Sequence, residues 1–171
     1  MRVLIMALII FLNYLLQSTL LPSAAVFGVT PDTALAFIVS YAVMRGDVEG
    51  AAFGFAAGLT QDVFGGYFVG LYALLGLVAG YFCGKPFKDF FKDNFFLPFL
   101  VVFFASFAYQ FMFYCAAFLF TGRADFPYLF ATIILPKTIY TVSVSVPVYA
   151  LLYLINSRLE TYEKNRRSLF E

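Results

Sequence analysis

Four carboxylates in the N-terminal half are the side chains best suited to chemistry: Asp32, Asp47, Glu49 and Asp62. Paired carboxylates can serve as general acid and base. Here, however, no nucleophile–base pair, metal-ligand spacing or phosphate-binding loop accompanies them. The chain also has no histidine, the commonest general base and metal ligand. We therefore expect no catalytic residue, no metal site and no cofactor.

The two cysteines, Cys83 and Cys115, lie inside apolar segments. Small buried hydrophobic side chains are a better interpretation of them than a disulfide or a metal site. No pattern typical of nucleic-acid binding is present either. The polar residues are scattered rather than clustered, which argues against a third class, a polytopic lipid-modifying enzyme.

The composition predicts an integral membrane protein. Hydrophobic residues make up 63% of the 171 residues, charged residues 12%, and the mean hydropathy is +0.88. Soluble proteins average roughly 25% charged residues. Because a lone strand in lipid leaves its backbone groups unpaired, even the β-branched run 138–146 should be helical. The expected fold is an all-α polytopic bundle, a single transmembrane domain over 1–157 followed by a cytoplasmic tail, 158–171.

About six transmembrane helices are expected. The first apolar run is longer than a signal-peptide core of ~7–15 residues. A retained helix is therefore preferred to a signal cleaved after the Pro22–Ala25 segment. Thr30 should cap the second helix, with Pro31 at its first position. The predicted spans are roughly 3–21, 32–45, 48–63, 67–84, 95–120 and 138–156.

Two stretches should lie at the membrane surface or enter the membrane only part of the way. Residues 85–93 alternate lysines with aromatic residues, as an interfacial segment or a solvated loop does. Pro136 should break or kink the last apolar stretch, leaving a short helix at Pro127–Leu135. Lys137 would then extend its ammonium to the outer interface or enter a buried ion pair.

The cations predict the orientation. With six spans, one side collects nearly all of them, and only Arg123 and Lys137 fall on the other. The positive-inside rule then places both termini in the cytoplasm. Asp32 and Asp62 fall near the outer face, where they could approach each other.

Glycines recur every four residues in two neighbouring helices, which places each set on one helix face. Such smooth faces let helix backbones approach closely in lipid. The two sets are Gly50, Gly54 and Gly58, and Gly76, Gly80 and Gly84. Asp62 extends the first set, either as an interfacial helix-end acid or as a functional one. For Asp32, stabilisation of a helix N-terminus competes with a contact to a partner.

This arrangement resembles the MreD family of rod shape-determining membrane proteins. The likeness rests on residues 31–84. The matching residues, which we assign to partner binding or helix packing, are Pro31, Asp32, Gly50, Gly54, Gly58, Asp62, Gly70, Tyr72, Gly76 and Gly80.

The resemblance implies a non-enzymatic scaffold subunit of the cell-elongation complex (elongasome) in the bacterial inner membrane. Such a subunit binds MreC directly and acts with MreB, RodA and a penicillin-binding protein to control cell shape and lateral peptidoglycan synthesis. A homo-oligomer is possible. The family is also similar in fold to the S-components of energy-coupling-factor transporters. The alternative function is therefore a vitamin- or small-molecule-binding S-component, although the first helix has no glycine and only one alanine, Ala7, where such subunits have a docking motif of small residues.

Overall fold

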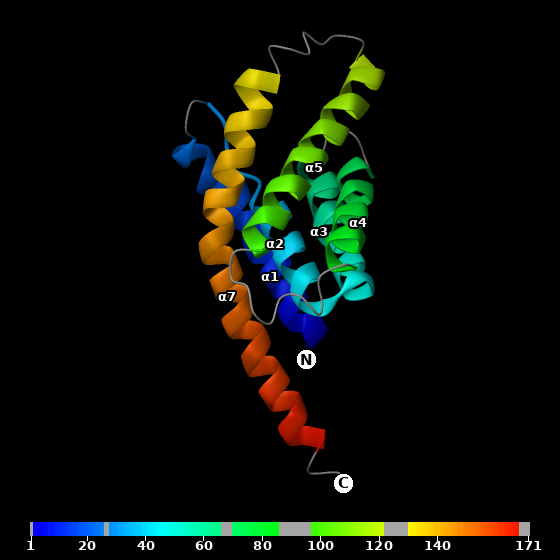
Figure 1. Ribbon diagram of the computed structural model, residues 1–171, viewed down its shortest axis with the longest axis vertical. Coiled ribbons are helices and arrows are strands. Elements are labelled where there is room, and N and C mark those ends of the chain that lie inside the picture. The colour runs from blue at the N-terminus through cyan, green and yellow to red at the C-terminus, as the bar shows by residue number, and fades with distance from the viewer. Residues whose placement is uncertain (1, 26–27, 66–69, 86–96, 122–129, 168–171) are drawn as a thin grey trace.

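The protein is described by a computed structural model that covers residues 2–25, 28–65, 70–85, 97–121 and 130–167 (Figure 1). These residues form six α-helices with two short helical turns, so the expected all-helical architecture is confirmed. The run 138–146 is helical despite its β-branched residues. The elements are α1 (Arg2–Thr19), η1 (Leu21–Ala24), α2 (Thr33–Arg45), α3 (Asp47–Gly65), α4 (Leu71–Gly84), α5 (Leu97–Thr121), η2 (Phe130–Ile134) and α7 (Leu135–Arg167).

The helices run alternately up and down one elongated bundle, and the start of α1 and the end of α7 both lie at its lower end in Figure 1. Among the described residues, three stretches are long and apolar enough to cross a membrane: Leu4–Ser23, Phe99–Ala116 and Thr132–Leu159. Apolar α2 and α4 have only 13 and 14 residues. At 1.5 Å per residue they are shorter than a bilayer core of about 30 Å.

The short helix α2 is the centre of the bundle. It packs against all five other α-helices. Ten of its residues are buried, from Thr33 to Val43. A helix that is apolar on every side and enclosed by its neighbours needs no lipid contact, so its short length exposes little backbone.

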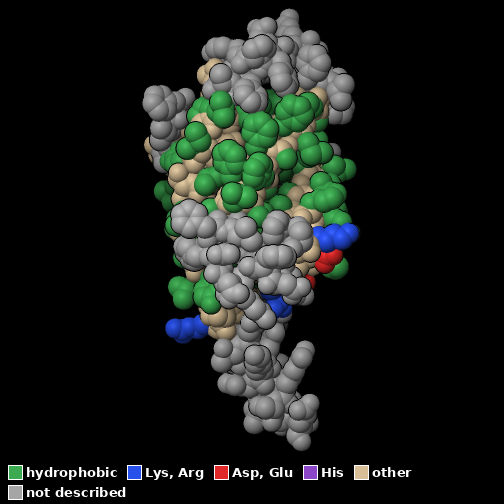
Figure 2. All heavy atoms as spheres, in the orientation of Figure 1, with side chains coloured by type: hydrophobic (Ala, Val, Ile, Leu, Met, Phe, Trp, Pro, Cys, Tyr) green, Lys and Arg blue, Asp and Glu red, His purple; other side chains and the backbone are tan. Residues whose placement is uncertain are grey.

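Two clusters of side chains fill the space around α2. One joins α2 to α4 and α5 through residues such as Leu35, Leu75 and Val102. The other joins α2 to α1, α3 and α7. Large apolar side chains also cover the outside of the bundle, and Figure 2 shows them as a green band with charged side chains below it. This surface suits a lipid environment.

The region around Pro136 differs from the prediction. Instead of a separate short helix, a π-helical turn, η2, leads directly into α7. Pro136 is the second residue of α7, where the missing N–H costs little, so it does not break the helix. Helix α7 also continues past the predicted end of the last span, as far as Arg167. Residues 127–129 of the expected short helix and most of 85–93 lie outside the described residues.

Candidate functional site

The glycine faces of α3 and α4 pack against each other. Gly54 lies opposite Gly76, and Gly50 lies opposite Gly80. A Cβ built on any of these four would come closer than 3.0 Å to the carbonyl oxygen of its opposite glycine. Gly58 meets the backbone of Tyr72 in the same way. The repeated glycines therefore form a backbone-to-backbone contact inside the bundle, which leaves these faces covered in this structure.

Asp62, at the end of the α3 glycine face, caps the neighbouring helix. Its two carboxylate oxygens accept the backbone N–H groups of Tyr72 at 3.1 Å and Ala73 at 2.8 Å. The first N–H groups of a helix have no partner within it, and an anion there also complements the helix dipole. Gly70, with a φ of +94°, turns the chain into α4 just before these residues. The buried acid thus fixes where α4 begins against α3.

Asp32 caps α2, and this corrects the predicted helix start. Thr30 was expected as the cap and Pro31 as the first helical residue. Instead, Asp32 Oδ1 accepts the N–H of Leu35 at 3.1 Å, and Pro31 lies before the cap, buried. An aspartate is as good an N-cap as a threonine and carries the favourable charge as well.

A hydrogen-bonded link joins this cap to α7. The Asp32 N–H donates to Thr141 Oγ1 at 3.0 Å, and the Thr141 hydroxyl donates to the Lys137 carbonyl oxygen at 2.7 Å. Thr141 is fully buried. The start of α2 and the first turns of α7, more than a hundred residues apart in sequence, are therefore held in one register.

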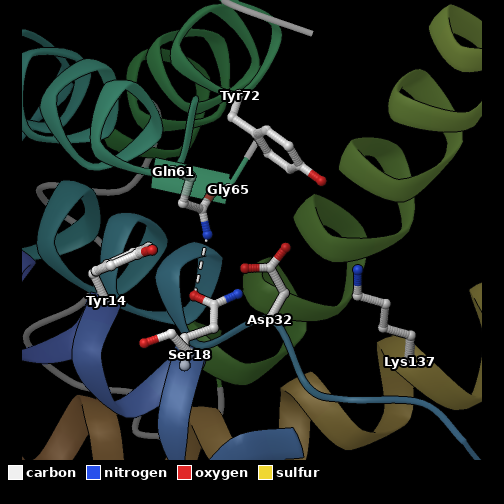
Figure 3. A pocket seen from close by; sticks show the side chains of 8 residues that line it. Tyr14, Ser18, Asp32, Gln61, Gly65, Tyr72 and Lys137 are labelled. Atoms are coloured by element: carbon white, nitrogen blue, oxygen red, sulfur yellow. Dashed lines mark hydrogen bonds between the residues drawn. The ribbon is translucent and has the colours of Figure 1, made fainter. Parts of the chain in front are cut away.

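Asp32 and Lys137 also line a cavity of about 230 Å³ (Figure 3). Its lining is polar and comes from α1, α3, α4, α7 and the α2 cap. Asp32 and Lys137 project into it from two walls, and the Tyr72 hydroxyl points into the same space. The Gln61 amide donates to Gln17 Oε1 at 3.1 Å at its edge. Of the two acids expected near each other, Asp32 lines this cavity, whereas Asp62 is engaged by the start of α4.

The sequence indicated only part of this cavity. Asn13 and Gln17 lie four residues apart on the first helix, and the structure buries Asn13 and pairs Gln17 with Gln61. Lys137 was expected to reach an interface or an ion pair, and its place on the cavity wall was missed. In the sequence, only its position one residue after Pro136 distinguished Lys137 from the other lysines.

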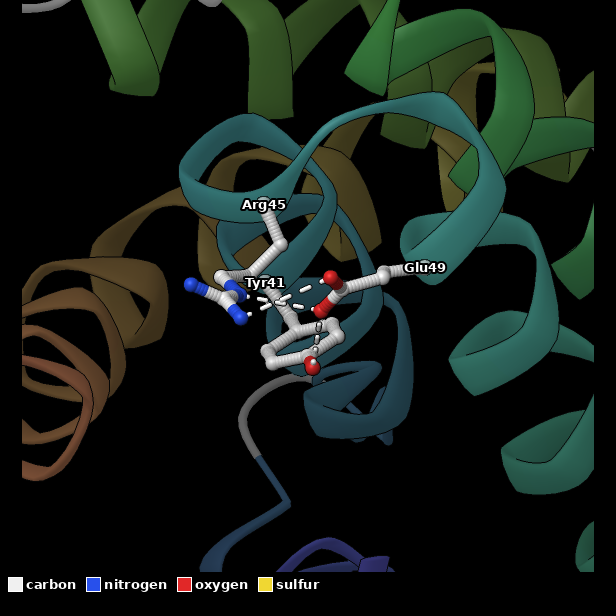
Figure 4. A network of polar contacts seen from close by, with 3 residues as sticks. All are labelled: Tyr41, Arg45 and Glu49. Carbon is white, nitrogen blue, oxygen red and sulfur yellow. Dashed lines mark hydrogen bonds and ion pairs between the residues drawn. The ribbon is translucent and has the colours of Figure 1, made fainter. Parts of the chain in front are cut away.

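At the other end of the bundle, three side chains tie α2 to α3 (Figure 4). Glu49 Oε2 accepts from Arg45 Nε at 2.9 Å and from the Tyr41 hydroxyl at 3.2 Å. Between the helices, Gly46 adopts a φ of +100°, and its N–H donates to the Ala42 carbonyl oxygen at 2.7 Å. Arg45 ends α2 and Glu49 lies in the first turn of α3. They are four residues apart in sequence, the spacing of an ion pair within one helix, although a sharp turn separates their helices.

Beside this network a second hollow, of about 370 Å³, opens between α1 and α3, and we call it the α1–α3 groove. Its walls are mostly apolar, and several of the residues are small. They are Met6, Ala7, Ile10, Tyr41, Glu49, Ala52, Phe53 and Ala56.

The described residues also lack a cluster of side chains that could form a metal site. No group of three or more histidine, cysteine, aspartate or glutamate residues within them could hold a metal ion. Cys83 is buried, Cys115 is half-buried, and both thiols are free. What the site offers is a polar cavity at one end, an apolar groove at the other and a rigid glycine contact between them.

One comparison with known proteins finds a matching protein family. A family model described as rod shape-determining protein MreD matches residues 1–159 of this chain. No curated protein matches the chain. No solved structure matches it either.

Proposed function

The chain belongs to the MreD family of rod shape-determining proteins, and we propose that it is a scaffold subunit of the bacterial cell-elongation complex. The observation that carries this proposal is the match of the family model to residues 1–159. The site is consistent with it: the carboxylates Asp32 and Asp62 serve as helix caps. In this role the protein binds MreC directly and works with MreB, RodA and a penicillin-binding protein to direct lateral wall growth.

We further propose that the membrane helix of MreC lies in the α1–α3 groove. The α3–α4 glycine faces are already covered by each other, so they are poor candidates for a partner contact. In the groove, Ala52 and Ala56 are exposed and four residues apart, which lets another helix approach closely. In lipid such close packing is a main source of helix association.

Co-purification with MreC from native membranes tests this. Filling the groove with Ala52→Leu and Ala56→Leu should reduce MreC recovery at least about tenfold, since both side chains would occupy the space of the incoming helix. Ala150→Leu is the matched control, because Ala150 is an exposed alanine on α7. Unchanged recovery with the groove filled would reject this surface. Absence of MreC from wild-type preparations would reject the wider proposal.

The proposed location is the bacterial inner membrane, crossed by all six α-helices with both termini in the cytoplasm. The cation distribution supports this orientation. An even number of crossings also agrees with the start of α1 and the end of α7 lying at one end of the bundle (Figure 1). Self-association into a homo-oligomer remains part of the proposal, and the same purification, analysed by mass, would detect it.

The alternative of a vitamin-binding S-component has no support among the comparisons. The polar cavity of about 230 Å³ is also below the roughly 300–1,000 Å³ typical of sites for drug-sized ligands. The likeness to S-components is proposed only for the arrangement of the six helices.

A further inference from the structure

The polar cavity holds one carboxylate and one ammonium that do not neutralise each other. Asp32 Oδ1 accepts a backbone N–H, and Lys137 makes no ion pair or side-chain hydrogen bond within the described part of the chain. Both side chains face the cavity (Figure 3). Asp32 is buried and its carboxylate has one backbone donor, and since a buried charge is costly without partners, a further donor from the cavity would stabilise it.

The Thr141 hydroxyl holds the backbones of the two charged residues together. Thr141 accepts the Asp32 N–H and donates to the Lys137 carbonyl oxygen, so both charged residues are anchored to one buried hydroxyl. Asp32 is only 3% exposed and is fixed further by capping α2. The carboxylate in particular is a preorganised acceptor.

The charge pattern selects a class of ligand. A simple cation would be attracted by Asp32 but repelled by Lys137, and a simple anion would meet the reverse. A ligand that carries both a positive and a negative charge can interact favourably with both Asp32 and Lys137. The cavity also offers the Tyr72 hydroxyl as a donor. Gln61 Oε1 is buried and has no hydrogen-bond partner, so it is an acceptor available to an N–H group.

We propose that this cavity binds a zwitterion consisting of a primary ammonium joined by a short chain to a phosphate or carboxylate. The ammonium donates to Asp32 and Gln61, and the anionic oxygens accept from Lys137 and Tyr72. Charge-assisted hydrogen bonds of this kind are roughly twice as strong as neutral ones. A phosphatidylethanolamine headgroup and a free amino acid or phosphoethanolamine share this chemistry. The assignment stands independently of MreC binding.

Native mass spectrometry of retained lipids tests whether the ligand is a lipid headgroup. The purified full chain is exchanged into micelles containing equal amounts of phosphatidylethanolamine and phosphatidylcholine, whose quaternary ammonium cannot donate a hydrogen bond. The wild-type chain should retain phosphatidylethanolamine at least about tenfold over phosphatidylcholine. Asp32→Asn, which keeps a good N-cap, and Lys137→Gln should each abolish the preference. Lys85→Gln is the matched control, because Lys85 is an exposed lysine beside Tyr81 at the other end of α4.

Thermal unfolding in the presence of glycerophosphoethanolamine or the free amino acid glycine tests whether the ligand is a soluble zwitterion. A rise in the unfolding midpoint that is lost in both variants, without lipid selectivity, would support the binding chemistry and assign it to a soluble ligand. Equal retention of both lipids together with no shift by either soluble probe would overturn the proposal. The proposal would also be overturned if Lys85→Gln lost as much lipid preference or thermal shift as Lys137→Gln. Lys137→Gln decides the outcome even if Asp32→Asn is poorly folded, because the Lys137 side chain supports no other described contact.

Discussion

Gly54 and Gly76 face each other across α3 and α4, and a Cβ on either residue would lie closer than 3.0 Å to the carbonyl oxygen of the other. The contact is reciprocal and made by backbone on both sides, so neither helix can relieve an added side chain by rotating a rotamer. It is repeated one turn away by Gly50 and Gly80. Helices α3 and α4 are therefore held together by direct backbone contact along their glycine faces.

Adding a methyl group to this contact should separate the pair. We expect Gly54→Ala and Gly76→Ala to destabilise the protein by about 1–3 kcal/mol, the usual cost of overpacking. Gly54→Ile should prevent accumulation in the membrane. Gly65→Ala is the control, because a Cβ there meets nothing within 4 Å. Thermal unfolding of purified protein and membrane levels of a tagged chain would measure both effects. Equal midpoints for Gly54→Ala and Gly65→Ala would contradict the packing argument.

Loss of the Asp62 carboxylate should loosen the start of α4. Asp62→Ala leaves the N–H groups of Tyr72 and Ala73 without their acceptor, and a lost cap costs about 0.5–2 kcal/mol. Asp62→Asn should recover part of that stability, since its amide oxygen can still accept one hydrogen bond. The measurement is the unfolding midpoint in detergent. Asp62→Asn behaving like Asp62→Ala would show that the charge matters rather than the hydrogen bonds.

Thr141→Val should weaken the connection between α2 and α7. The substitution nearly preserves shape but removes the acceptor of the Asp32 N–H, and a buried unpaired donor costs about 1–3 kcal/mol. Ser143→Ala is the control: the Ser143 hydroxyl donates to the Ile139 carbonyl oxygen of its own helix, and Ser143 is exposed. That control should change stability by less than about 0.5 kcal/mol. A Thr141→Val midpoint equal to that of Ser143→Ala would refute the link.

Fusions at the chain ends should report the same side of the membrane. Fluorescent protein fused before Arg2 or after Glu171 should fluoresce, because it folds in the cytoplasm, and alkaline phosphatase at the same points should be inactive. A phosphatase fused after Thr121, at the opposite end of the bundle, should be active. Activity of the phosphatase at Glu171 would reverse the proposed orientation.

Some features of this protein follow from sequence alone because they depend on local composition and period. The all-helical fold follows from hydropathy, since helices satisfy their own backbone in lipid. The glycine spacing of four residues places Gly50, Gly54 and Gly58 on one face whatever surrounds them. The Pro31–Asp32 pair likewise located the start of α2 to within one or two residues, although it suggested the wrong cap.

Only the tertiary structure decided what those faces and caps contact. The burial of the α3 glycines against α4 depends on long-range packing. A glycine face that binds a partner protein would show the same four-residue spacing in the sequence. The cavity has walls from five parts of the chain, and Lys137 joins Asp32 there because Thr141 on α7 accepts the Asp32 N–H. A local pattern specifies which way a side chain points on its own helix. The neighbour it meets is set by how all the helices share one core.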